Sequence, residues 1–281
     1  MARTFNTGRR LLLRATAKTA PRHRDRSTPA PFVVLSTQRT GSTWLVEHLH
    51  AHPAIFMFAE LFLNEGDGMP QFVGDGTLPF FNTYAREREM RSGWLSQRRV
   101  LREYLDEVYR PREGVRATGF KLMYSQVPRI FQLTLHLARR RVKIVHLVRR
   151  NLVDVFLSKK AREQRGFAHS KDDAPVKQVR LAIDATELLA FADRITREHA
   201  SWRKELDRAG LERCELAYED FVADANRLDD AVRFLGFEPA PSTERETLQK
   251  LARTRHDEQI ENYDEVARAL EGTAYEDMLG V

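Results

Sequence analysis

The chain has little cysteine and no long apolar run, and each absence excludes a class of protein. Its one cysteine, Cys214, excludes an intrachain disulfide, and we expect it to be a packing residue in a short strand. The N-terminal run Leu11-Leu12-Leu13 is too short for a signal-peptide core or a membrane span, so we expect a cytoplasmic protein. The length of 281 residues suffices for one large domain with a buried core.

Positive charge is concentrated at the N-terminus. The chain has a formal charge of +6, but residues 1–31 carry +7, so the remaining residues sum to −1. A nearly neutral globular part argues against nucleic-acid binding. We expect residues 1–31 to form a basic, disordered tail and residues 32–281 to form a single domain. The alternative role for the tail is weak association with an anionic membrane surface.

A strand followed by a small-residue turn stands at the start of the expected domain. The apolar run at 32–35 precedes Ser36-Thr37-Gln38-Arg39-Thr40-Gly41-Ser42-Thr43-Trp44. Backbone N–H groups and the dipole at a helix N-terminus attract anions. The hydroxyls of Ser42 and Thr43 can donate hydrogen bonds, and Arg39 can contact phosphate or sulfate oxygens in bidentate fashion. The segment therefore predicts an anion-binding loop.

This loop lacks the signature of nucleoside-triphosphate enzymes. That signature is G-x-x-x-x-G-K-[ST], whereas here Ser36 takes the place of the first glycine and no lysine follows Gly41. An ATP- or GTP-dependent enzyme is disfavoured, although a P-loop-type kinase and a non-catalytic nucleotide-binding relative stay open as alternatives. We expect no metal site, because His48, His50 and His52 rotate around a helix and suit solvated or helix-end positions.

A second strand-to-helix junction lies about a hundred residues further on. An apolar run at 142–148 is followed by Arg149 and Arg150, and Asn151 is a suitable N-cap for a helix from Leu152. Cations at the carboxyl end of a strand lie where open α/β sheets bind ligands. Ser158 follows Arg150 by eight residues, a step of about 80° on a helix, so both should lie on one broad face.

The remaining pattern alternates strands with helices. Strands are expected at 32–36, 116–123, 142–148 and 213–217. Helices are expected at 43–51, 94–109, 128–140, 152–164, 178–208, 226–235 and 243–253, and a long loop at 165–177. This alternation predicts an α/β fold with a parallel sheet covered by helices on both faces.

With these motifs the chain resembles the sulfotransferases that use 3'-phosphoadenosine 5'-phosphosulfate (PAPS). The segment from Gln38 to Trp44 is similar to their 5'-phosphosulfate loop, and Arg150 and Ser158 match their R-x-x-x-x-x-x-x-S signature for the 3'-phosphate. Tyr218 begins a stretch similar to their Y-E-D-[LF] segment, whose tyrosine lies near the adenine; core packing is the alternative role for Tyr218. The resemblance implies a P-loop-like three-layer α/β domain, PAPS as donor, 3',5'-adenosine bisphosphate (PAP) as product, and no metal.

Finer features resemble bacterial carbohydrate sulfotransferases of the nodulation-factor and trehalose type. Arg39 replaces the lysine of cytosolic animal enzymes, and residues 119–126 are similar to the G-x-K-[LI]-M-[WY]-x-Q strand end of that branch. Glu60 stands where the trehalose enzymes carry a catalytic carboxylate. The resemblance implies a carbohydrate or glycolipid acceptor, Glu60 as general base and Arg39 on the leaving group. For Glu60 the alternative is a loop carboxylate that makes an ion pair. Lys121 either neutralises the sulfuryl oxygens or makes a structural salt bridge.

The C-terminal part departs from the cytosolic animal enzymes. Their R-x-G-x-x-G-x-W-K loop is absent, and residues 253–265 resemble the nodulation-type tail instead. Arg253 and Arg255 are therefore both open as a further contact for the 3'-phosphate.

Overall fold

The computed structural model describes residues 29–63, 78–90, 93–127, 131–164, 180–240 and 255–279. Their centre is a five-stranded sheet in the order β2-β3-β1-β4-β5, in which every neighbouring pair is parallel. The strands are β1 (Ala30–Ser36), β2 (Ile55–Glu60), β3 (Ala117–Met123), β4 (Lys143–Val148) and β5 (Arg213–Ala217). The strand order reverses direction at β1, which lies between β3 and β4. Ligands of open α/β sheets bind at such a point, outside the carboxyl ends of the strands.

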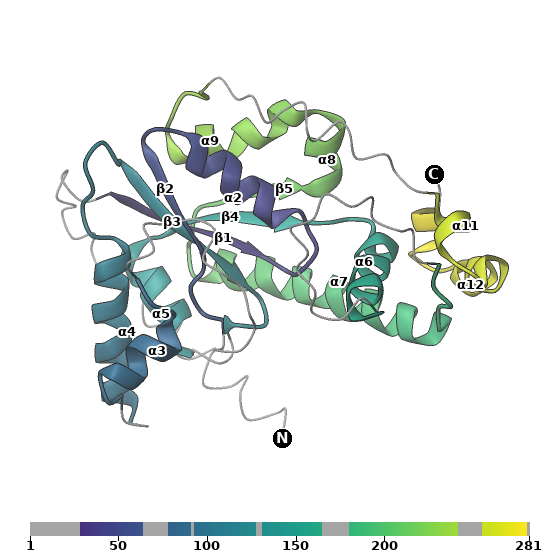
Figure 1. Cartoon of the computed structure of the whole chain (residues 1–281), viewed down its shortest axis with the longest axis horizontal. Helices are drawn as coiled ribbons and strands as arrows, with labels where there is room; N and C mark the ends of the chain where they lie inside the picture. Colours follow the sequence, from purple (N-terminus) through teal and green to yellow (C-terminus); the bar gives the residue numbers. More distant parts are fainter. Residues whose placement is uncertain are drawn as a thin grey trace.

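Helices cover both faces of the sheet (Figure 1). One face carries α2 (Ser42–Ala51), α8 (Tyr218–Ala223), the 3-10 helix η2 (Ala225–Leu228) and α9 (Asp229–Leu235). The other carries α3 (Phe81–Glu87), α4 (Trp94–Val108), α5 (Phe131–Arg140) and part of α7 (Ala185–Arg208). The expected α/β fold with a parallel sheet between helices is confirmed.

A third group of helices lies at the carboxyl end of the strands, near the right-hand side of Figure 1. It consists of α6 (Leu152–Gln164), α11 (His256–Gln259), α12 (Tyr263–Leu270) and the 3-10 helix η3 (Glu276–Leu279). Its apolar residues pack on the N-terminal half of α7. The C-terminal segment, residues 255–279, is therefore attached through α6 and α7 to the end of the sheet at which a ligand is expected.

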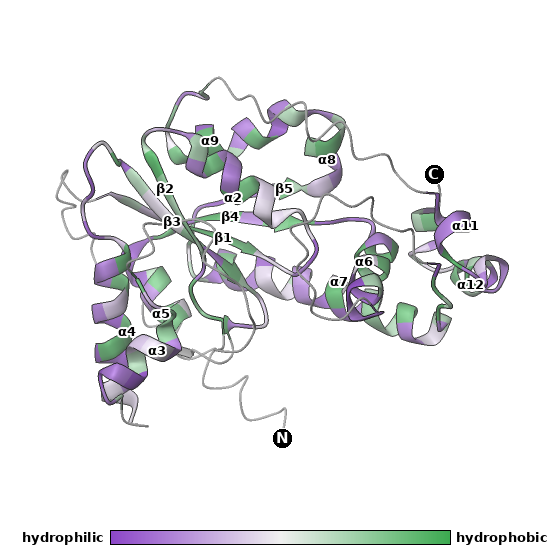
Figure 2. Cartoon of the chain, viewed as in Figure 1, coloured by the Kyte–Doolittle hydropathy of each residue, from purple (hydrophilic) through white to green (hydrophobic). Residues whose placement is uncertain are grey.

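The sequence of β1 explains its central position. Phe32 and Val34 face the α2 side, whereas Val33 and Leu35 face the α4 side, and all four are buried. A strand buried on both faces is apolar without alternation, and most of β1 is accordingly green in Figure 2. Gly119 on β3 allows the close packing of β1, because a Cβ there would lie 2.5 Å from the Phe32 ring.

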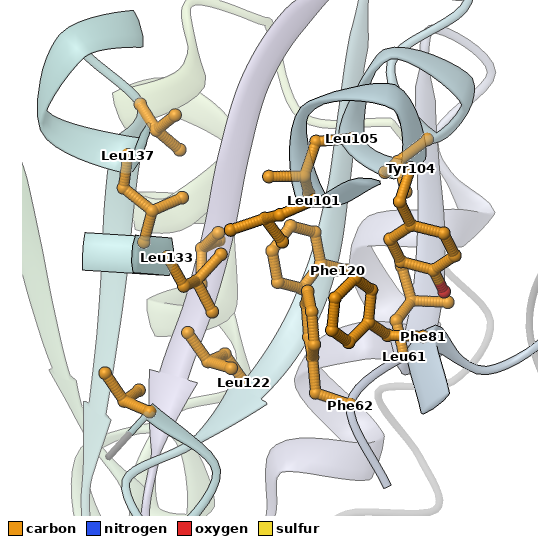
Figure 3. Packing of buried hydrophobic residues seen from close by; sticks show 14 of the residues in the cluster. Leu61, Phe62, Phe81, Leu101, Tyr104, Leu105, Phe120, Leu122, Leu133 and Leu137 are labelled. Carbon is orange, nitrogen blue, oxygen red and sulfur yellow. The ribbon is translucent and has the colours of Figure 1, made fainter. Parts of the chain in front are cut away.

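The larger core cluster lies between the sheet and α3, α4 and α5 (Figure 3). Phe62 is central to it, with ring centroids 5.4 Å from Phe81, 5.9 Å from Tyr104 and 5.5 Å from Phe120. Apolar burial of this kind stabilises a domain by roughly 25 cal/mol per Å². The cluster holds β2 and β3, and therefore Glu60 and Lys121, in fixed positions.

Several element bounds differ from the sequence-based expectation. Strand β1 begins at Ala30, so residues 30 and 31, which we expected in the tail, belong to the sheet. Strand β2 was not predicted at all, although residues 55–59 are apolar. The helix expected from 178 begins at Ala185, because Asp184 caps it by accepting hydrogen bonds from the backbone N–H groups of the first turn.

Other differences concern short helices, and some expected elements lie outside the described residues. The helix expected at 226–235 starts as η2 and becomes α-helical at Asp229. The short helices α3, α8, α11 and α12 were not predicted. The expected helix at 243–253 and loop at 165–177 lie outside the described residues, as does the tail before residue 29.

A chain of polar groups lies between the sheet and α7, with Tyr124, His146 and His199 buried and Glu215 and Arg203 partly exposed. The Tyr124 hydroxyl is hydrogen-bonded to Nε2 of His146, and Nδ1 of His146 lies 2.9 Å from Oε2 of Glu215. Glu215 in turn accepts two hydrogen bonds of 2.8 Å from Arg203. The ring of His199 packs edge-on against Tyr124 and His146. These contacts join the end of β3 to β4, β5 and α7.

Candidate active site

The loop between β1 and α2 has the backbone geometry of an anion cradle. Arg39 and Gly41 both adopt positive φ angles, of 63° and 76°. The Thr40 hydroxyl donates a 3.0 Å hydrogen bond to the Thr37 carbonyl and so closes the turn. Helix α2 starts at Ser42 without a side-chain cap on its first N–H groups. Uncapped N–H groups at the positive end of a helix dipole suit an anionic ligand.

The loop and the second strand–helix junction meet through Arg39. Its Nε donates a 2.7 Å hydrogen bond to the hydroxyl of Ser158, which is 119 residues away on α6. The Arg39 carbonyl accepts a 3.3 Å hydrogen bond from Arg149. The two motifs that the sequence predicts to bind anions therefore lie side by side at the carboxyl end of β1 and β4.

Arg150 is held by the acidic pair at the start of α8. Its two terminal nitrogens donate to the two oxygens of Asp220 at 2.7 and 2.5 Å, and this carboxylate raises the pKa of Arg150 above its usual value. Glu219 accepts hydrogen bonds from the backbone N–H groups of Arg150 and Asn151. We expected Arg150 and Ser158 to act together, but in the structure Ser158 is bonded to Arg39 and Arg150 to Asp220.

Tyr218 packs directly on the loop from Gln38 to Thr43 between β1 and α2, called the anion loop below. A Cβ at Gly41 would lie 2.6 Å from the Tyr218 ring, so the tyrosine and the glycine are in close contact. The ring stacks on Trp44 with centroids 6.4 Å apart and planes 17° apart. The Arg149 guanidinium lies 4.2 Å from the Tyr218 ring centroid, a cation–π contact. All three sequence motifs therefore meet at this position.

Glu60 and Lys121 form a second cluster, also near the carboxyl ends of the strands. Glu60 is the last residue of β2, and its register partner on β3 is Lys121. Lys121 Nζ lies 3.0 Å from Oε1 of Glu60, and Gln126 donates a 2.8 Å hydrogen bond to Oε2. All three side chains are buried. The structure thus includes the salt bridge that was one of the two expectations for Lys121.

Sequence reasoning missed a link from the C-terminal segment to this site. Asp154 on α6 receives a 2.8 Å hydrogen bond from Arg149, and its other oxygen lies 2.9 Å from Nε2 of His256. Burial raises the pKa of Asp154, but His256 and Arg149 together outweigh it, so this pKa is below its usual value. The signal that could have found Asp154 was its place in the first turn of the predicted helix, where carboxylates are favourable.

Arg253 and Arg255 were both open as further contacts for the 3'-phosphate. Arg253 lies outside the described residues, and Arg255 is paired with Asp257 at 2.7 Å. His48 lies in the last turn of α2, which fits the expected helix-end position, but it is buried and lies 3.1 Å from Asp229, so it is not solvated. Within the described part of the chain, no group of three or more His, Cys, Asp or Glu is arranged to hold a metal ion. None of the described helices is both long and apolar enough to cross a membrane.

Solved structures similar to the chain include three sulfotransferases. One is from Alicyclobacillus acidocaldarius, with 18% identity over 89% of this chain and 95% of that chain, and a TM-score of 0.41. The second is the sulfotransferase domain from the curacin biosynthetic pathway, with 18% identity, 80% of each chain covered and a TM-score of 0.42. The third is mouse sulfotransferase SULT7A1 complexed with PAP, with 13% identity over 84% of this chain and 66% of that chain, and a TM-score of 0.41.

Comparison with curated protein sequences gives no match. A family model described as "Sulfotransferase family" matches residues 31–241. This range includes the anion loop, Glu60, Lys121, the Arg150–Ser158 signature and Tyr218. Because the match covers well over half of the chain, the protein belongs to the sulfotransferase family, enzymes that take the sulfuryl group from PAPS.

Proposed function

We propose that the protein transfers the sulfuryl group of PAPS to a hydroxyl of a carbohydrate or glycolipid acceptor at the carboxyl edge of β1, β3 and β4. The observation that carries this proposal is the 2.7 Å hydrogen bond between Arg39 and Ser158. It brings a loop suited to a phosphosulfate and a helix suited to a second phosphate within reach of one adenylyl compound.

The donor would bind across this contact. Its 5'-phosphosulfate would lie on the loop from Gln38 to Thr43, where Arg39, the N–H groups of α2 and two hydroxyls can donate hydrogen bonds. Its 3'-phosphate would reach Arg150 and Ser158. The adenine would lie near Trp44 and Tyr218, whose stacked rings form an aromatic surface beside Gly41. A donor with anions at both ends of its nucleoside fits this distribution of cations.

The reaction is a displacement at sulfur. The acceptor oxygen attacks the sulfur as the bond between sulfur and the phosphate bridge oxygen breaks, and PAP leaves with that electron pair. Negative charge grows on the bridge oxygen, where Arg39 and the loop donors would stabilise it. One well-placed donor of this kind contributes about 3 kcal/mol. The proton of the acceptor hydroxyl must pass to a base.

Glu60 is the proposed base because its carboxylate is oriented and still has accepting capacity. Lys121 forms a salt bridge with one carboxylate oxygen of Glu60, and Gln126 donates a hydrogen bond to the other. Each carboxylate oxygen has two lone pairs, so both oxygens can accept a further proton or hydrogen bond. Lys121 would orient Glu60 and add positive charge beside the transferring group.

The acceptor class rests on features of this chain that resemble the carbohydrate-directed branch. These are Arg39 in the loop, Gly119 to Gln126 at the end of β3, and Glu60 at the end of β2. The basic segment before residue 29 would favour an acceptor at an anionic membrane surface, such as a glycolipid.

Glu60→Gln tests the assignment of the base. We expect turnover to fall by a factor of about 10² to 10⁴, the usual contribution of a general base, while PAP affinity stays within about twofold. Turnover would be measured with radiolabelled donor sulfate on an acceptor found by screening oligosaccharides and glycolipids. Glu87→Gln, at an exposed residue of α3, is the control for removing one carboxylate. Equal turnover of Glu60→Gln and the parent would exclude Glu60 as base.

A further inference from the structure

The backbone of Arg39 is in a conformation that its own residue type disfavours. Its φ angle is 63°, in the left-handed region, which costs a non-glycine residue roughly 1–2 kcal/mol. Such a conformation persists only where surrounding contacts fix it, and it is common at functional sites. Arg149 bonds the Arg39 carbonyl and Ser158 bonds its guanidinium, so the residue is fixed at both ends.

Arg149 is itself fixed on two sides. One terminal nitrogen donates to Arg39, and the other donates to Asp154 at 2.8 Å. The guanidinium lies over the Tyr218 ring, and the side chain is only 14% exposed. A planar guanidinium held by a carboxylate and an aromatic ring has little freedom to turn. The position of the Arg39 carbonyl therefore depends on Asp154.

His256 completes the arrangement from the C-terminal segment. It lies at the start of α11, is 7% exposed, and places Nε2 2.9 Å from the Asp154 oxygen that Arg149 does not use. Asn151 makes a second link from this junction to the C-terminal segment, through a 2.8 Å hydrogen bond from its side-chain nitrogen to the Met278 carbonyl. The C-terminal segment is thereby attached to the start of α6, beside the anion loop.

We propose that His256, Asp154 and Arg149 are positioning residues that act in series on Arg39. His256 orients Asp154, Asp154 orients Arg149, and Arg149 holds the Arg39 carbonyl so that the guanidinium points at the departing phosphate oxygen. The proposal rests on the proposed function of Arg39 and assigns the C-terminal segment a part in it.

The test is a double-mutant cycle between His256 and Arg39. We expect His256→Ala to lower kcat/KM about tenfold, because a misplaced catalytic group loses this much or more. His256→Gln should recover most of the loss, since its amide can donate to Asp154. In an Arg39→Gly background, where glycine tolerates the same backbone conformation, His256→Ala should change kcat/KM less than twofold. His52→Ala is the matched control, because the hydrogen bonds of His52, to the Glu238 carbonyl and from the Ala54 N–H, lie away from this series.

Additive losses in the cycle would overturn the proposal, because they would mean that His256 does not act through Arg39. Asp154→Asn gives a second break in the series if His256→Ala disturbs folding, and the same non-additivity with Arg39→Gly is expected. The proposed function fails separately: a parent enzyme that binds PAP no better than 5'-AMP would contradict it. If the parent enzyme prefers PAP but the losses in the double-mutant cycle are additive, only the proposed series of His256, Asp154 and Arg149 is contradicted.

Discussion

At the scale of single residues, Gly41 shows how closely the loop and the Y-E-D segment fit. Its φ of 76° and the Tyr218 ring, 2.6 Å from a would-be Cβ, both require glycine. We expect Gly41→Ala to cost about 3 kcal/mol or more of unfolding free energy in urea, from backbone strain plus overpacking. Gly114→Ala is the control, since Gly114 has a similar φ of 72° and open space around it. Equal costs at the two positions would contradict the close contact.

A second residue-scale prediction concerns the carboxylate on Arg150. Asp220 occupies both terminal nitrogens of Arg150, which are the atoms a 3'-phosphate would use. The side chains of Arg150 and Asp220 are 61% and 44% exposed, so their ion pair contributes at most about 1 kcal/mol to the free energy of folding. We expect Asp220→Asn to tighten PAP binding by up to about fivefold in a titration, while 5'-AMP binding stays unchanged.

The control for Asp220→Asn is Asp230→Asn. Asp230 pairs with Arg233 at 3.0 Å, with side chains of similar exposure, on the face of α9. This variant should leave the affinity for PAP unchanged. Weaker PAP binding by Asp220→Asn would show that Asp220 orients Arg150 for the phosphate rather than competing with it.

At the scale of elements, the polar chain that joins β3, β4, β5 and α7 through Tyr124, His146, Glu215 and Arg203 makes the stability of the fold depend on pH. Burial lowers the pKa of His146, and it lowers that of His199 to about 4. Hydrogen bonds from His146 and Arg203 lower the pKa of Glu215. Each group therefore binds protons more readily when the chain is unfolded. The contribution of the two histidines is complete above their unfolded pKa of about 6.5 and is lost as pH falls, for His199 down to about 4. The contribution of Glu215 is lost only below its unfolded pKa of about 4.3.

We expect His199 alone to account for about 2 kcal/mol of the stability lost between about pH 7 and about pH 5. The measurement is urea unfolding at both pH values for the parent and for His199→Leu. His199 Nε2 is buried without a hydrogen-bond partner among the described residues, so leucine removes the titrating group without breaking a bond there. The variant should be less sensitive to pH than the parent. An unchanged dependence on pH would show that His199 does not titrate in this range.

At the scale of the whole molecule, the parallel sheet explains why distant motifs form one site. The ends of β1, β4 and β5 carry the anion loop, the Arg149–Ser158 segment and Tyr218, and parallel pairing places these ends at one edge. The sequence allowed this to be predicted, because each motif follows a segment that was expected to be a strand, and the first two of these segments are apolar runs. Asn151 was also predicted correctly as an N-cap, since its side-chain oxygen accepts from the Asp154 N–H at 3.0 Å.

The features of the fold and the site that were not predicted depend on contacts between distant residues, which no local sequence pattern encodes. Strand β2 lies at the edge of the sheet. Its apolar run before Glu60 is only five residues long, and it was not recognised from the sequence as a strand. The contact of Ser158 with Arg39 could not be inferred from a spacing that links Ser158 with Arg150. His256 and Asp154 are 102 residues apart, and only the packing of the C-terminal segment on α6 and α7 brings them together.

The most direct test of the account is calorimetric titration of the parent enzyme with PAP, 5'-AMP and ATP with Mg²⁺. Charge-assisted hydrogen bonds to the 3'-phosphate should make PAP bind about 10 to 100 times more tightly than 5'-AMP. Arg150→Ala should remove this preference, whereas Arg233→Ala, at an arginine with a similar aspartate partner on α9, should keep it. Equal binding of PAP and 5'-AMP, or a preference for ATP with Mg²⁺, would contradict the account.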